Sequence, residues 1–154
     1  MDVDAVLHRA PSVALVDEFA HANNPGSRNS SRWQDINELL AAGIDVVSTV
    51  DIQQLASLAD VVRAVTDSDP AETVPDHVVR RADQIELVDI SPELLRQRLA
   101  EGRIHPLEQV DAAMANYFRL GNLAALRELA LLWLADRVDE GLEDYRSGKG
   151  IEQS

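Results

Sequence analysis

The sequence predicts an α/β fold in which a small parallel sheet is followed by a helical C-terminal part. Three short apolar runs, at 13–16, 44–50 and 85–89, have the length and composition of strands, and segments with helical periodicity separate them. Aromatic residues make up only 4% of the chain, so aliphatic side chains must build the core. Strands that alternate with helices are typical of parallel sheets with right-handed crossovers. Because three strands are few for an open α/β domain, we expect the sheet to be incomplete on its N-terminal side.

The N-terminal part of the chain is predicted to form a short helix, a strand and a loop. Residues 3–7 fit one apolar face of a short helix that ends before Pro11. The run at 13–16 is apolar without alternation, as expected for a strand with both faces covered. Residues 21–31 are polar and turn-forming, which predicts a loop.

Two capping patterns mark the next helices. Ser31 and Gln34 have the spacing of a capping box, and the helix that they begin should end at Gly43, which suits a left-handed terminus. Asp51 and Gln54 repeat the pattern after the second strand. The helix that follows them is expected to point five side chains inward: Leu55, Leu58, Val61, Val62 and Val65.

Helices are also predicted on both sides of the third strand. A short one begins at Asp76. Ser91 followed by Pro92 marks the start of another, because serine is a good N-cap and proline is tolerated at the first helical position. This second helix should end near Gly102.

The remainder of the chain is predicted to be helical. One helix runs from about 106 to 119 and stops at Gly121, and a last one runs from about 122 to 145. The last helix is apolar nearly all round between 129 and 135, so it should be buried against this domain or against a partner.

The expected organisation is one domain over 1–145 with a tail or linker at 146–154. Within the domain, the α/β part covers about 1–103 and the helical part 104–145.

Composition and charge exclude several classes of function. The net charge of −13 argues against binding to nucleic acids or anionic membranes, because both need a basic surface. Cysteine is absent, which excludes disulfides, thiolate metal sites and cysteine nucleophiles. No apolar run approaches the roughly 18 residues of a membrane helix, and the N-terminus has no signal-peptide pattern. We therefore expect a cytoplasmic protein that does not insert into a membrane.

Two adjacent carboxylates follow the first strand. Asp17 and Glu18 have the positions of a Walker B pair, in which the aspartate holds Mg²⁺ through water and the glutamate polarises an attacking water. The alternative is an acidic strand end that is simply solvated. His21 could join them as a metal ligand, although a loop histidine of this kind is more often solvated.

A nucleotide site also needs groups that hold phosphate. The pattern Gly-x-x-x-x-Gly-Lys-Ser/Thr is missing from the 154 residues, whose only lysine is Lys149. Arg28 and Arg32 are the remaining candidate anion contacts, and solvation or pairing with nearby acids is the alternative for both. Gln53 could sense a γ-phosphate, although helix capping by its neighbours explains this segment equally well.

Four stretches together resemble one protein family. They are VDEFAH, NPGSR, RWQDINELLAAGIDV and GNLAALRELAL, and they are similar to the N-terminal cytoplasmic domain of KdpD-type osmosensitive potassium sensor histidine kinases. The resemblance implies a P-loop-NTPase-like fold with an ATP and Mg²⁺ site, whose phosphate loop lies upstream of this segment. It places Asp17 and Glu18 on the Walker B acids and His21 on the histidine that usually follows. The family commonly has Asn-x-Gln-His where residues 51–54 of this chain read DIQQ.

Three functions stay open. The leading hypothesis is a sensory module of a two-component system that acts by binding and interaction, with ATP and Mg²⁺ binding weak or absent because the phosphate loop is missing. The family's kinase core and phosphoaccepting histidine are absent, so the chain by itself is not expected to be an enzyme. The second hypothesis is a Mg²⁺-dependent nucleotide hydrolase that another chain completes, with Glu18 as its catalytic residue. The third is a structural dimerisation module. The expected partners are a second copy or the rest of a sensor kinase.

Overall fold

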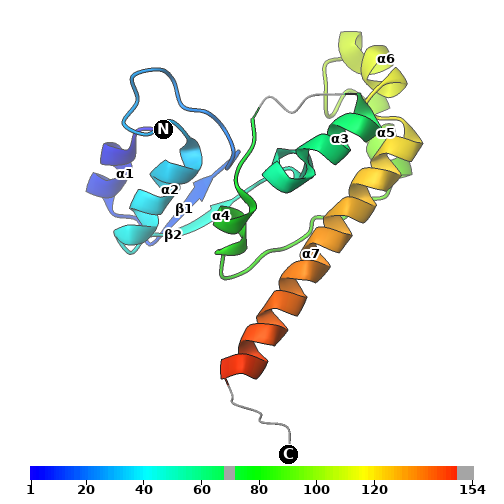
Figure 1. Ribbon diagram of the computed structural model, residues 1–154. Coiled ribbons are helices and arrows are strands. Elements are labelled where there is room, and N and C mark those ends of the chain that lie inside the picture. Colours follow the sequence, from blue (N-terminus) through cyan, green and yellow to red (C-terminus); the bar gives the residue numbers. More distant parts are fainter. Residues whose placement is uncertain (68–71, 149–154) are drawn as a thin grey trace, which may run out of the picture. The chain divides into compact units, whose positions relative to one another are not determined.

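The computed structural model describes residues 1–67 and 72–148, which form a mixed α/β structure (Figure 1). In these ranges there are seven α-helices and two strands: α1 (Val3–Arg9), β1 (Val13–Val16), α2 (Arg32–Ala41), β2 (Asp45–Ser48), α3 (Ala59–Thr66), α4 (Asp76–Arg80), α5 (Pro92–Ala100), α6 (Leu107–Ala115) and α7 (Leu120–Gly148). Two short 3₁₀ turns, Ile52–Gln54 and Ala56–Leu58, precede α3. The predicted tail lies outside the described residues from 149 onward.

The described residues form two compact units. Unit 1 contains residues 1–60 and 72–79, with both strands, α1 and α2. Unit 2 contains residues 61–67 and 80–148, with α5, α6 and α7.

The sheet of unit 1 has two strands. β1 and β2 pair in parallel, with Val13 opposite Asp45 and Val16 opposite Ser48. The third strand predicted at 85–89 is wrong for the described structure, because these residues form no strand and Val88 is exposed. Their aliphatic composition suits a strand, but a strand also needs a neighbouring backbone with which to exchange hydrogen bonds.

One face of the sheet is covered by α1 and α2. Leu39 and Ile36 of α2 are buried in a cluster with Val3 of α1 and Val16 of β1. Leu39 is fully buried. This cluster forms the core around the sheet, and it includes Val16, the last residue of β1.

The other face of the sheet is left uncovered by the described residues of unit 1. Side chains alternate between the two faces of a strand, and the members on this face, Val13, Leu15 and Val47, are each at least half exposed. The expectation that β1 has both faces covered is therefore not met by the described residues.

Most of the capping signals are confirmed. The Ser31 N–H donates to Gln34 Oε1 at 3.1 Å, and Gly43 has the positive φ of 81° that ends α2. Ser91 Oγ accepts from the Leu94 N–H at 3.3 Å at the start of α5. The box at Asp51 caps a 3₁₀ turn instead of a long helix.

Two helix predictions need correction. α3 begins only at Ala59, so the side chains expected to share one buried face do not all share it: Val62 is buried and Val61 is exposed. Gly121 does not stop a helix but lies inside α7. The break between α6 and α7 falls earlier. There the Phe118 N–H donates a hydrogen bond to the Ala113 carbonyl at 3.0 Å, and the Phe118 side chain is buried.

Unit 2 has its own core at the junction of α5, α6 and α7. Leu99, Val110, Phe118 and Leu123 are buried there. Arg127 of α7 forms a two-pronged ion pair with Asp89, which ties the segment before α5 to α7. Among the described residues, no helix is long and apolar enough to cross a membrane.

Candidate functional site

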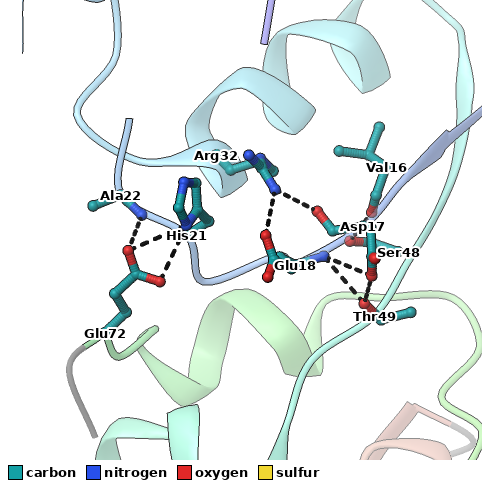
Figure 2. A network of polar contacts seen from close by, with 9 residues as sticks. All are labelled: Val16, Asp17, Glu18, His21, Ala22, Arg32, Ser48, Thr49 and Glu72. Carbon is teal, nitrogen blue, oxygen red and sulfur yellow. Dashed lines mark hydrogen bonds and ion pairs between the residues drawn. The ribbon is translucent and has the colours of Figure 1, made fainter. Parts of the chain in front are cut away.

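The carboxyl ends of β1 and β2 bring Asp17 and Thr49 together (Figure 2). The Thr49 hydroxyl donates a hydrogen bond to Asp17 Oδ1. The Glu18 N–H donates to Asp17 Oδ1 at 2.9 Å and to Thr49 Oγ1 at 3.1 Å. These two donors, Thr49 first, and the positive charge of Arg32 lower the pKa of Asp17. Asp17 is therefore held as a carboxylate at neutral pH.

Glu18 has a backbone conformation that is uncommon for its residue type. Its φ is +55°, in the left-handed region. The hydrogen bonds of its own N–H and the bond from the Phe19 N–H to the Thr49 carbonyl, at 2.8 Å, hold the chain in this shape. Such conformations cluster at functional sites, because the surrounding structure must compensate for their cost.

Arg32, the first residue of α2, faces both carboxylate residues. Its Nη1 donates to the Asp17 carbonyl oxygen at 2.9 Å and to Glu18 Oε2 at 3.3 Å. The Arg32 side chain is largely buried, whereas that of Glu18 is exposed. The guanidinium group is thus fixed beside the strand ends, and its contact with Glu18 is the more solvent-accessible of the two.

Asp51 adds a third carboxyl group. Asp51 is an exposed residue, but neighbouring atoms partly desolvate its carboxyl group and so raise its pKa, and the negative charges of Asp17 and Glu18 raise it further. Gln53 Nε2 donates to Asp51 Oδ2 at 3.4 Å. The structure therefore brings the predicted site residues Asp17, Glu18, Arg32 and Gln53 into one region.

Thr49 and Asp51 are the site residues that the sequence interpretation missed. Thr49 was part of a predicted strand, and Asp51 was considered only as a helix cap. A usable signal existed, because the carboxyl ends of neighbouring parallel strands meet at one edge of the sheet. A polar residue after the second strand should therefore lie near Asp17.

The other two candidates have partners elsewhere in unit 1. His21 Nδ1 lies 3.3 Å from Glu72 Oε2, and Glu72 also accepts from the Ala22 N–H at 2.8 Å (Figure 2). Arg28 forms ion pairs with Asp4 of α1 and Glu38 of α2. Within the described residues, no three His, Asp or Glu side chains are grouped so that they could hold a metal ion. A water-mediated Mg²⁺ contact by Asp17 stays a prediction.

Replacing Asp51 with asparagine is expected to stabilise unit 1 at neutral pH. The raised pKa means that the folded state disfavours the charged form of Asp51, and asparagine removes this charge while it can still cap the turn. The difference from wild type should shrink as the pH falls through the pKa of Asp51 toward the unfolded value of 3.8, because Asp51 then becomes neutral too.

Urea unfolding at pH 7 and pH 4 measures this effect, with Trp33 fluorescence reporting on unit 1 in a Trp133→Phe background. Asp45→Asn is the matched control, because it makes the same change of charge at the opposite end of β2, away from Asp17 and Glu18. A loss of stability at pH 7 in the Asp51 variant would contradict the prediction.

Comparisons with known proteins agree on one family. The family model described as "KdpD: Osmosensitive K+ channel His kinase sensor domain" matches residues 1–138. The chain belongs to the KdpD sensor-domain family. The resemblance noted in the sequence is thereby confirmed.

Several curated KdpD proteins are similar over nearly the whole chain. "Sensor protein KdpD" of Mycobacterium tuberculosis (strain H37Rv) is 61% identical over 98% of this chain and 18% of the relative. The protein of that name from Escherichia coli (strain K12) is 53% identical over 99% of this chain and 17% of its own length. A "Putative sensor protein KdpD" of Synechocystis is 46% identical over 91% of this chain and 38% of its own length. The chain thus spans less than a fifth of the first two KdpD relatives.

Proposed function

We propose that this chain is a regulatory module of a two-component potassium sensor kinase, and that it responds to Mg²⁺–nucleotide at the carboxyl ends of β1 and β2. Membership of the KdpD sensor-domain family supports the first part. The cluster of Asp17, Thr49 and Arg32 supports the second, because it places an ionised carboxylate beside a fixed guanidinium. By the same family relationship we propose a cytoplasmic location.

Each residue of the site has a role that its geometry suits. Asp17 would hold Mg²⁺ through water, since its carboxylate is ionised and Thr49 fixes its orientation. Arg32 would contact phosphate oxygens, and Gln53 would lie near them. Bound Mg²⁺ would neutralise phosphate charge, which matters in a chain with a net charge of −13.

A phosphate loop is not among the 154 residues, so the site needs a second contributor. We propose that another segment of the kinase, or another chain, supplies it. The residues of this chain then act as the metal-facing half of the site, and affinity in the isolated chain should be low.

Regulation by binding fits the site better than turnover. A hydrolytic role would need Glu18 free to orient water, but its carboxylate is paired with Arg32 at 3.3 Å and its backbone is held in the left-handed region. The hydrolase completed by another chain is therefore the second candidate. Its test is phosphate release by the completed kinase, which Glu18→Gln should abolish if Glu18 is catalytic.

Replacing Asp17 with asparagine is expected to weaken Mg²⁺–ATP binding at least tenfold, or about 1.4 kcal/mol. Asparagine keeps the shape of the side chain but lacks the charge that attracts the metal. Calorimetric titration of the chain with ATP, with and without Mg²⁺, measures the effect. Asp45→Asn is the matched control and should bind as wild type does. Because the isolated chain lacks a phosphate loop, the same titration is repeated with the completed kinase. Absence of Mg²⁺-dependent binding there, or equal affinity of the Asp17 variant, would overturn the proposal.

We also propose that the domain associates with a second copy of itself. The described residues leave two apolar surfaces open, the free face of the sheet in unit 1 and part of α7 in unit 2. Contiguous apolar surface of this kind is typical of interaction sites.

A further inference from the structure

Helix α7 of unit 2 has two apolar faces. Leu123, Leu126 and Trp133 are buried on one of them. Leu131, Val138 and Leu142 are between 43% and 56% exposed. At about 100° per residue, these three lie about 140–180° around the helix from Trp133. A surface helix normally carries charged residues in that position.

Several of the exposed apolar residues form a regular stripe, whereas Leu132, which is 64% exposed, lies beside it. We define the α7 stripe as Leu131, Ala135, Val138 and Leu142, which follow one another at steps of four, three and four residues. Ala135 is exposed as well. This alternation of three and four is the spacing of a coiled-coil seam, in which each side chain packs against a partner helix.

Nothing else in unit 2 covers the stripe in the described residues. The core formed with α5 and α6 uses the N-terminal part of α7, around Leu123 (Figure 1). Further along, α7 faces the segment 80–85. The Arg80 guanidinium lies 5.2 Å from the centre of the Trp133 ring, and Val138 at the border of the stripe lines a shallow pocket with residues 82–85. Val138 is still 56% exposed, so the described part of unit 2 leaves the stripe as exposed apolar surface on a helix that its other residues anchor.

We infer that the α7 stripe pairs with the α7 stripe of a second copy, in antiparallel orientation. This inference rests on the proposed self-association and names its surface. A two-fold axis between Ala135 and Val138 places Leu131 opposite Leu142 of the second copy. The same axis places the small Ala135 opposite the larger Val138, so the seam fills without a gap.

A parallel pairing of the two α7 helices would match both side-chain sizes and charges less well. It sets Ala135 against Ala135, which leaves a void. It also sets Glu128 against Glu128, because Glu128 is the next residue of the seam before Leu131. Like charges in a seam are destabilising. The antiparallel orientation avoids both contacts.

Charge also favours α7 over the open face of the sheet as the contact between copies. The sheet face ends in Asp45 at one side and in the ionised Asp17 at the other. An antiparallel pairing of two such faces would bring Asp17 of one copy toward Asp45 of the other. The α7 stripe has no acidic member between Leu131 and Leu142.

Sedimentation equilibrium of the full chain tests the contact. Wild type is expected to dimerise, and Val138→Glu should raise the dimer dissociation constant at least tenfold. Leu15→Glu is the matched control, because it places the same charge on the other exposed apolar surface and should leave dimerisation unchanged. Circular dichroism checks that each variant is folded.

Each outcome separates the two proposals. A dimer that Leu15→Glu weakens and Val138→Glu does not would keep self-association but overturn the α7 contact. A wild type that stays monomeric at all accessible concentrations would overturn both.

Single cysteines test the orientation, because the chain has none of its own. An equimolar mixture of Leu131→Cys and Leu142→Cys should form a mixed disulfide dimer on mild oxidation, whereas each variant alone should not. In a parallel pair, each variant would cross-link with itself, and that result would overturn the antiparallel arrangement.

Discussion

Replacing Leu39 with alanine is expected to destabilise unit 1 by about 2–5 kcal/mol. Leu39 is fully buried among Val3, Val16, Ile36 and Ile44. Its removal leaves a cavity that these β-branched neighbours, stiff in their side chains, can fill only in part. This is a large fraction of the about 5–15 kcal/mol that stabilises a typical domain.

Leu40→Ala is the control, because Leu40 is the next residue of α2 and is half exposed. Both substitutions replace leucine with alanine in the same helix, so helix propensity cancels in the comparison. Urea unfolding followed by Trp33 fluorescence in a Trp133→Phe background reports on unit 1 alone, since the chain has just these two tryptophans. Equal losses for the two variants would show that Leu39 is not at the centre of the core.

The features that the sequence predicted correctly are those that depend on interactions between residues close together in the chain. The capping box of Ser31, the left-handed Gly43 and the start of α5 at Ser91 involve residues three or four positions apart, and all three are confirmed. The end of α6 and the start of α7, in contrast, depend on the burial of Phe118, which is a tertiary contact. The prediction that Gly121 stops a helix was therefore wrong. Gly121 is the second residue of α7, and the about 1 kcal/mol that glycine costs in a helix is outweighed there by packing.

The prediction of a third strand at 85–89 was wrong for a different reason. The run at 85–89 has a strand composition, but pairing depends on a neighbour far away in the sequence or in another segment. The described residues provide β1 with one neighbour, β2, and provide the run at 85–89 with none. Composition reports which segments can be strands and says nothing of whether a partner is present.

The site was predictable in part. Asp17 and Glu18 were expected because two acids follow an apolar run, and Arg32 because it is a cation near them. Thr49 and Asp51 were missed, although Thr49 is the group that most lowers the pKa of Asp17. Their importance comes from strand register, which aligns Val16 with Ser48 and so sets Asp17 beside Thr49.

Replacing Asp35 with alanine is expected to destabilise unit 1 by about 1–3 kcal/mol and to loosen the loop at 21–31. Asp35 is a buried carboxylate of α2 that accepts hydrogen bonds from Asn23 Nδ2 and Asn29 Nδ2, both at 2.8 Å. Without Asp35, the Asn23 amide keeps its bond to the Asn29 carbonyl, but both side chains lose their buried acceptor. Asparagine-rich loops hold their shape through such bonds.

Hydrogen exchange of the loop amides measures the loosening, and Asn24→Ala serves as its control, because Asn24 is an exposed residue of the same loop. Exchange should become at least tenfold faster in the Asp35 variant at the amide of Asn23, which donates to the Ser30 carbonyl at 2.9 Å. Unchanged exchange in the Asp35 variant would mean that the turn residues alone hold the loop.

The same substitution should reach the candidate site through Arg32. The Arg32 N–H donates to the His21 carbonyl at 2.9 Å, so the loop and the guanidinium that faces Asp17 are joined at one residue. We therefore expect Asp35→Ala to weaken Mg²⁺–ATP binding although Asp35 makes no contact with Asp17 or Glu18 in the described structure. Calorimetric titration beside the Asn24→Ala control checks this, and an affinity equal to that of the control would show that the loop and the site are independent.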